Sequence, residues 1–133
     1  MQLHCEPAQR PDSLAEVSRR TADERAFEFE LADFLHEFAY HSDEGMLAEV
    51  PALLCDHYRK GAVFDAYLAA VAVSLSVRSG WPAPAWTRAP SRVLREPWFA
   101  NPGRHMRALL LVESPAAFRE RNLFVSANAL SVA

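Results

Sequence analysis

Three groups of residues in this chain carry side chains that could do chemistry. Cys55, Asp56 and His57 place a thiol, a carboxylate and an imidazole next to one another in sequence. Adjacent residues do not face one another on a helix, and nucleophilic catalysis needs groups that are adjacent in space. His36 and His41 are five residues apart, which would put them on different sides of a helix. From these two groups we assign no catalytic residue, no cofactor and no metal ligand, and we expect the chain not to be an enzyme.

The third group is the densest polar cluster, and it lies near the C-terminus. Glu113, Ser114 and Pro115 are followed by Arg119 and Arg121. In one interpretation Ser114 caps a short helix that Pro115 begins and that ends near Arg121, and the arginines pair with nearby glutamates. In the other, the guanidinium groups form a site for an anion or a protein partner. We favour the structural interpretation and keep the functional one as its alternative.

Composition restricts the classes of partner. The formal net charge is -3, from 14 Lys and Arg against 17 Asp and Glu, so nothing in the total charge favours nucleic acid. The glycines Gly45, Gly61, Gly80 and Gly103 stand alone, which leaves no glycine-rich loop for a phosphate group. We therefore expect a partner other than nucleic acid or a nucleotide.

The ends and the apolar stretches indicate where the chain works. The first residues lack a basic segment followed by an apolar one, so we expect no signal peptide and a cytoplasmic location. The apolar run from Ala62 to Val77 is interrupted by Asp65 and is too short to cross a bilayer comfortably, so we expect a core helix and no membrane contact. Two cysteines are too few for a disulfide framework, and Cys55 is expected to be buried.

The elements that must position these residues are predicted to be mainly α-helical. We expect one compact helical domain over 1–133, with 1–12 as a flexible N-terminal tail, around a central buried helix at about 62–78. Gly80 is expected to cap that helix in a left-handed conformation. Half of the residues are hydrophobic, which is typical of an ordinary globular protein.

Before the central helix, the patterns predict a short helix and a long one. Ser13 with Glu16, and Thr21 with Glu24, both match the capping box at a helix start. The second helix is expected over about 22–40, with one apolar face and an acidic outer side that includes Glu28. Met46 to Val50 predicts one helical turn, and Pro51 predicts the start of another short helix.

After Gly80, prolines and tryptophans alternate and predict an irregular wrap across the helices. Either these rings cover the central helix, which we favour, or some of them line a pocket or partner groove. The run from Met106 to Val112 predicts a helix, with a short strand as the alternative. Leu123 to Val125 predicts a brief extended segment, so one short strand or hairpin is compatible with the pattern.

Three segments carry a resemblance to other proteins. Pro84-Ala-Trp-Thr87, then Glu96-Pro-Trp-Phe99, then the stretch from Leu109 to Val125 with its Glu-Ser-Pro and Phe-Arg-Glu-Arg-Asn motifs, resemble a C-terminal region of many uncharacterised bacterial proteins. Some of those carry a helix-turn-helix domain, and some are encoded beside nucleotidyltransferases of the abortive-infection and toxin–antitoxin type. This chain departs from the former group, because Ser13 to Tyr40 predicts acidic helices and no basic recognition helix.

The resemblance implies a non-catalytic protein-interaction module, antitoxin-like or accessory to a defence locus. Its partner would be a protein such as a nucleotidyltransferase-type toxin, and a homodimer is compatible with the aromatic content. A first alternative is a small ligand-binding protein or enzyme that uses the Trp-rich segment with Arg119, Arg121 or His105; a second is a dimeric DNA-associated regulator. The resemblance also implies a set of residues that form either a shared surface or a shared core. They are Trp86, Trp98, Phe99, Glu113, Phe118, Arg119 and Arg121.

Overall fold

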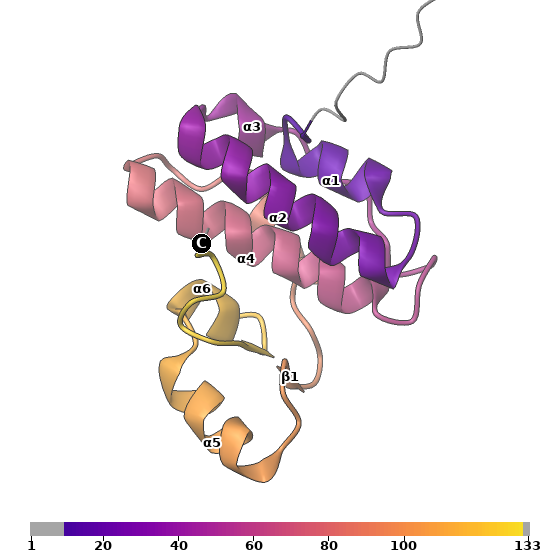
Figure 1. Ribbon diagram of the computed structural model, residues 1–133, viewed down its shortest axis with the longest axis vertical. Coiled ribbons are helices and arrows are strands. Elements are labelled where there is room, and N and C mark those ends of the chain that lie inside the picture. The colour runs from indigo at the N-terminus through magenta and orange to yellow at the C-terminus, as the bar shows by residue number, and fades with distance from the viewer. Residues whose placement is uncertain (1–9, 132–133) are drawn as a thin grey trace, which may run out of the picture.

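The computed structural model describes residues 10–131 and confirms a mainly α-helical fold (Figure 1). Its α-helices are α1 (Leu14–Arg20), α2 (Glu24–Tyr40), α3 (Gly45–Ala48), α4 (Gly61–Ser79), α5 (Arg104–Glu113) and α6 (Ala116–Arg119). Two short 3-10 helices, η1 (Ala85–Arg88) and η2 (Pro90–Arg92), and two strands, β1 (Trp98–Phe99) and β2 (Leu123–Phe124), complete the described elements. Of the expected flexible tail, residues 1–9 lie outside the described residues, whereas Pro11 is fully buried.

The two predicted capping boxes have different outcomes. At α1, Ser13 Oγ accepts a hydrogen bond from the Glu16 N–H at 3.1 Å, while the Glu16 carboxylate accepts from the N–H of Asp12, one residue earlier than in a standard box. The prediction for Thr21 was wrong. Thr21 ends α1, with its hydroxyl donating to the Val17 carbonyl, and Asp23 caps α2 by accepting from the Ala26 N–H at 2.8 Å.

The central helix is α4, as predicted. Its buried residues surround most of the helix, because small alanines on several sides let neighbouring elements approach closely. The elements η1, η2, α6 and β2 pack on α4, and on another side the Phe27 ring of α2 stacks on the Phe64 ring, with 4.1 Å between centroids. Near the C-terminal end Val77 is 72% exposed, so the apolar surface there faces solvent. Gly80 caps the helix with a φ of 76°, as expected.

By length and composition, α4 could cross a membrane. The helix has 19 residues and extends past the apolar run from Ala62 to Val77 at both ends. The core helix of a water-soluble protein has the same properties when it is buried. Most of α4 is buried inside this fold, which accounts for its composition without a bilayer.

The segment before α4 is held by a buried ion pair. The Asp65 carboxylate accepts from the N–H groups of Leu54 and Cys55, at 2.7 and 3.1 Å, and lies 3.9 Å from the Arg92 guanidinium. Arg92 also donates to the carbonyls of Asp65 and Pro51. Burial raises the pKa of Asp65, while the two N–H groups and Arg92 act in the lowering direction. The helix predicted to begin at Pro51 is absent, because the backbone of residues 51–55 serves this cluster instead.

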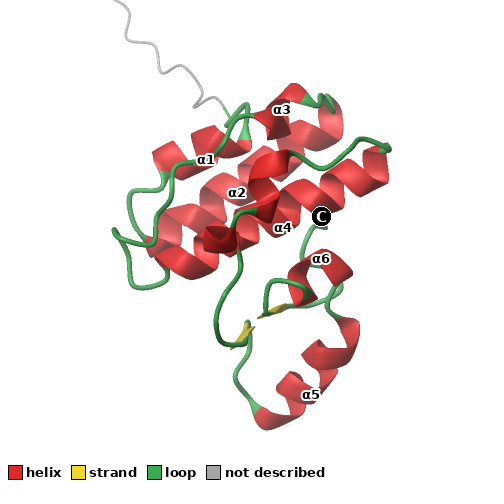
Figure 2. Cartoon of the chain, turned by 180° about the vertical axis from the view of Figure 1, so that it is seen from behind, coloured by secondary structure: helices red, strands yellow, loops and turns green. Residues whose placement is uncertain are grey.

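The C-terminal third leaves α4 and returns to it. Strands β1 and β2 pair in parallel, with Trp98 opposite Leu123 and Phe99 opposite Phe124, so the connection is a crossover through α5 and α6 and not a hairpin. Asn122, at a φ of 63°, turns the chain into β2. Helix α5 confirms the helical prediction for residues 106–112. It stands apart from the layer of α1, α2 and α4 in both views (Figures 1 and 2).

Ser114 does not cap α6 as predicted. It ends α5, where its hydroxyl lies within hydrogen-bond distance of the carbonyls of Leu110 and Val125 and accepts from the Val125 N–H. Pro115 stands in the N-cap position of α6, which is one residue later than expected. The hydroxyl is satisfied by the segment after β2, 11 residues away, and is therefore unavailable to α6.

Candidate functional site

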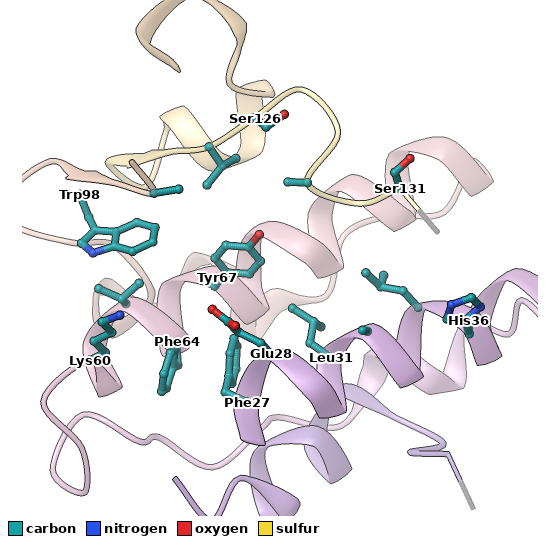
Figure 3. Close-up of a pocket in the computed structure, with 16 residues that line it drawn as sticks. Phe27, Glu28, Leu31, His36, Lys60, Phe64, Tyr67, Trp98, Ser126 and Ser131 are labelled. Atoms are coloured by element: carbon teal, nitrogen blue, oxygen red, sulfur yellow. The ribbon is translucent and has the colours of Figure 1, made fainter. Parts of the chain in front are cut away.

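An open cleft of about 550 Å³ lies between α2, α4, the end of β1 and the segment 125–131 that follows β2. Its side chains converge on one space, with α4 as the floor (Figure 3). This volume is within the range of about 300–1,000 Å³ that is usual for small-molecule sites. Most of the lining is apolar, and a few polar groups are placed among aromatic rings.

Contacts between rings fix the floor of the cleft. Phe27 stacks on Phe64, and Tyr67 meets Phe27 edge-on at 6.2 Å and Phe118 edge-on at 5.0 Å. Phe27 and Phe118 thus hold the Tyr67 ring between them, in geometries that aromatic pairs prefer. Because Phe118 is fully buried, the orientation of Tyr67 depends on core packing and not on a flexible surface contact.

The Tyr67 hydroxyl points into the cleft (Figure 3). It has no hydrogen-bond partner among the described residues, although most of its ring is covered. Burial, and secondarily the negative charge of Glu28, raise the pKa of Tyr67 to about 12. At neutral pH the group is therefore an uncharged phenol that can both donate and accept a hydrogen bond.

Two charged side chains stand at the exposed rim of the cleft. The Glu28 carboxylate lies beside the Tyr67 ring, and Lys60 lies below Trp98 near the start of α4 (Figure 3). Neither has an ion-pair partner within the described part of the chain. At the far end, His36 and Ser131 complete the lining.

The strand pair positions Trp98. The Trp98 N–H donates to the Asn122 carbonyl at 2.8 Å, and the Ala100 N–H donates to Phe124 at 3.0 Å. Trp98 is half-buried, and its ring forms one wall of the cleft. Of the two interpretations of the tryptophans, the pocket-lining one therefore applies to this residue.

Other residues of the implied surface are core residues. The Trp86 indole N–H donates to the Leu47 carbonyl at 3.0 Å, and the Arg92 guanidinium lies 5.0 Å from the centre of the Trp86 ring. Arg121 is buried and donates to the carbonyls of Ala117 and Thr87, both at 2.9 Å. The expected pairing of Arg121 with a glutamate is replaced by these carbonyls, which accept from the two terminal nitrogens of the guanidinium, whereas its buried Nε–H has no partner among the described residues. Trp86 and Arg121 therefore cannot form an exposed surface.

The remaining candidates lie outside the cleft lining. Phe99 stacks on Phe124 at 4.9 Å, with the Arg107 guanidinium 5.4 Å from its ring centre. Glu113 accepts a hydrogen bond from the Ala127 N–H at 3.1 Å, and Arg119 is exposed on α6. His105 is exposed on α5. The structure therefore does not bring the six implied residues together, and Trp98 is the member that lines the cleft.

Cys55 is exposed, and the prediction of a buried thiol was wrong. The backbone N–H of Cys55 donates to the Asp65 carboxylate at 3.1 Å. Desolvation and then the carboxylates of Asp56 and Asp65 raise the pKa of the thiol, which disfavours the reactive thiolate. Within residues 10–131, no group of three or more His, Cys, Asp or Glu side chains could hold a metal ion. His41 pairs with Glu37 at 2.8 Å.

Sequence patterns did not identify the cleft. The sequence predicts apolar surfaces on the two helices that carry Phe27 and Tyr67, and an acidic outer side with Glu28, without a reason to connect them. A signal was present in the spacing, because Glu28 lies three residues before Leu31 of the apolar face of α2 and is therefore a neighbour of that face. The partner element across the cleft, residues 125–131, is visible only in the fold.

Fold and cleft together define a mainly helical domain with an aromatic cleft between α2, α4 and residues 125–131. Comparison of the chain with protein-family models, curated proteins and solved structures gives no match. The resemblance carried by residues 84–125 therefore stays a prediction.

Proposed function

We propose that this chain is a non-catalytic protein-interaction module of the cytoplasm, antitoxin-like or accessory to a bacterial defence locus, and that it presents α5 to its partner. The observation that supports this most is the exposure of large apolar side chains on α5. Val112 is 78% exposed, Leu111 49%, Leu109 47% and Met106 37%. Exposure of several large apolar side chains on one helix is typical of interaction sites.

The contacts that attach α5 to the rest of the fold leave this apolar surface exposed. Leu110 is the buried residue of the helix, and α5 contacts β2. At its C-terminal end, Ser114 and Glu113 tie the helix to residues 125–127, and Arg107 covers Phe99. A helix held along one side and at one end can place its opposite side in the groove of another protein.

The charges on α5 indicate the kind of groove. Arg104 and His105 are exposed in the first turn, ahead of Leu109 and Val112. An apolar groove with an acidic rim at one end would complement both features, because charge complementarity sets orientation and association rate. The resemblance of residues 84–125 adds the class of partner, a nucleotidyltransferase-type toxin encoded in the same locus.

Co-expression with the product of the neighbouring gene tests the proposal. In the double variant Leu109→Asp/Val112→Asp we expect loss of co-purification, because two carboxylates would be buried in an apolar groove. Val77→Asp is the control, since Val77 is 72% exposed, close to the value of Val112, but lies on α4, and this variant should co-purify normally. Circular dichroism checks that all variants remain helical.

Two results would contradict the proposal. One is co-purification of the double variant at the wild-type level, which would place the interface elsewhere. The other is a wild-type homodimer, seen by light scattering, that the double variant converts to monomer while no locus product binds. In that case α5 would serve a second copy of the chain and not a different protein.

A further inference from the structure

We propose that the aromatic cleft between α2, α4 and residues 125–131 is a binding site for a small organic amine, a protonated amine attached to an apolar body. This goes beyond the proposed protein interaction, because no residue of α5 lines the cleft. The two proposals can be disproved independently, because one concerns the surface of α5 and the other concerns the cleft.

The apolar body is expected because the cleft is already formed. The rings of Phe27, Phe64 and Tyr67 are fixed by contacts with one another and with the core, so a ligand would not have to order them. Leu31 and Val125 extend the apolar surface on either side. A body of about the size of a benzene or indole ring could leave water and contact several of these walls at once.

The cationic group is expected from three features of the same space. The Glu28 carboxylate is unpaired among the described residues and stands beside Tyr67. The face of the Trp98 ring carries negative potential, which attracts an ammonium group. The Tyr67 hydroxyl, without a partner among residues 10–131, can accept a hydrogen bond from the same group.

The positive charge of Lys60 favours an anionic ligand over an amine, and the position of Lys60 decides which of the two the cleft prefers. It lies at the end of the cleft near the start of α4, whereas Glu28 stands beside the central ring (Figure 3). An anion beside Lys60 would gain one exposed charge pair but would meet ring faces that repel it. An amine beside Glu28 gains the charge pair and the rings together.

Three probes of nearly equal size separate these contributions: phenethylamine, phenylethanol and phenylacetate, titrated into the full chain by calorimetry and by tryptophan fluorescence. We expect phenethylamine to bind about fivefold or more tighter than phenylethanol, the effect of an exposed charge pair with a cation–π contact. Phenylacetate should bind most weakly. The fluorescence change should be lost in Trp98→Phe, because the other two tryptophans lie outside the cleft.

Charge-removing variants then locate the site. Glu28→Gln should weaken phenethylamine binding about fivefold and leave phenylethanol unchanged. Glu24→Gln is the matched control, because it removes the same charge one turn earlier on α2 at a residue that does not line the cleft, and it should have little effect. Lys60→Gln should strengthen the binding of the amine slightly.

Several results would overturn the inference. Phenylacetate binding as tightly as phenethylamine would mean that Lys60 and not Glu28 selects the ligand. If Glu28→Gln and Glu24→Gln weakened phenethylamine binding equally, the amine would respond to the overall negative charge of α2 and not to a site at Glu28. No binding of any probe up to its solubility, with the fold intact by circular dichroism, would mean that the cleft is not a site for such ligands.

Discussion

At the scale of single residues, Gly61 shows how closely the chain approaches itself. A Cβ atom at this position would lie 1.9 Å from the carbonyl oxygen of Leu54. Leu54 cannot retreat easily, because its N–H is held by the buried Asp65 carboxylate. Gly61, which stands alone in the sequence, is therefore required by packing.

Gly61→Ala is expected to lower the free energy of unfolding by about 3 kcal/mol, because the methyl group forces backbone to move. Gly45→Ala is the control. The nearest atom to a Cβ there is a side-chain oxygen at 3.5 Å, so the change should stay within about 0.5 kcal/mol. Urea unfolding of both variants provides the comparison. If both variants lowered the free energy of unfolding equally, the close approach of Gly61 to the Leu54 carbonyl would be contradicted.

Tyr67 predicts a pH dependence of stability at the alkaline end. Its pKa in the folded protein is about 12, against an ordinary value of 10.0. Between these values the unfolded chain loses the phenolic proton while the folded chain keeps it, so the contribution of Tyr67 is full below pH 10 and is lost as the pH rises through 12. Tyr67→Phe should therefore show a smaller loss of stability over that range.

An absorbance titration of phenolate formation measures the same group directly. Wild-type protein should show a step near pH 12 that is missing in Tyr67→Phe. The fold must be followed by circular dichroism in parallel. A wild-type step for this residue near its ordinary value, in protein that is still folded, would mean that the ring is more open to water than its position in the cleft implies.

At the scale of elements, α4 and α5 differ in how much of their surface is buried. α4 is covered on most sides, whereas α5 is attached through Leu110, Glu113 and Ser114. Local stability follows the number of buried contacts, so the two helices should open with different free energies. The exposed surface that suits α5 for binding is also the reason that it is held less firmly.

Ser114→Ala tests that attachment. The substitution removes the hydroxyl that receives the Val125 N–H at 2.8 Å, and leaves this donor buried without a partner. We expect a loss of about 1–3 kcal/mol. Hydrogen exchange of the α5 amides should accelerate more than that of the α4 amides. Ser91→Ala, at an exposed position of η2, is the control and should be nearly neutral. Uniform acceleration in both helices would contradict a local role.

At the scale of the whole molecule, the fold is organised around α4. Residues far apart in sequence meet on it, including Asp65 with Arg92 and Phe64 with Phe27. The ion pair and the aromatic floor of the cleft lie on the same helix, so the site depends on the integrity of this axis. Burial of α4 thus links stability to the proposed amine-binding cleft.

Leu68→Ala distinguishes a core helix from a membrane helix. Leu68 is fully buried, and truncation should lower the unfolding free energy in detergent-free buffer by about 2–5 kcal/mol. Val77→Ala, at an exposed position of the same helix, should change it by less than about 0.5 kcal/mol. In a flotation assay with lipid vesicles we expect the protein to remain in the aqueous fractions. Insertion into vesicles would overturn the core assignment.

The sequence by itself determined the features that depend on near neighbours in the chain. The bounds of α2 and α4 and the left-handed cap at Gly80 follow from periodicity and cap chemistry, which act over a few residues. Even here competition between neighbours mattered, because Thr21 serves α1 and leaves Asp23 to cap α2.

Only the tertiary structure decided which charged and aromatic side chains are buried and which converge. Arg121 and Arg119 are two residues apart, yet one is buried among carbonyls and the other is exposed. Phe27, Tyr67, Trp98 and Val125 form one cleft although they belong to four separate segments. The physical reason is that burial and convergence depend on the packing of distant elements, and this packing leaves no periodic trace in any single segment.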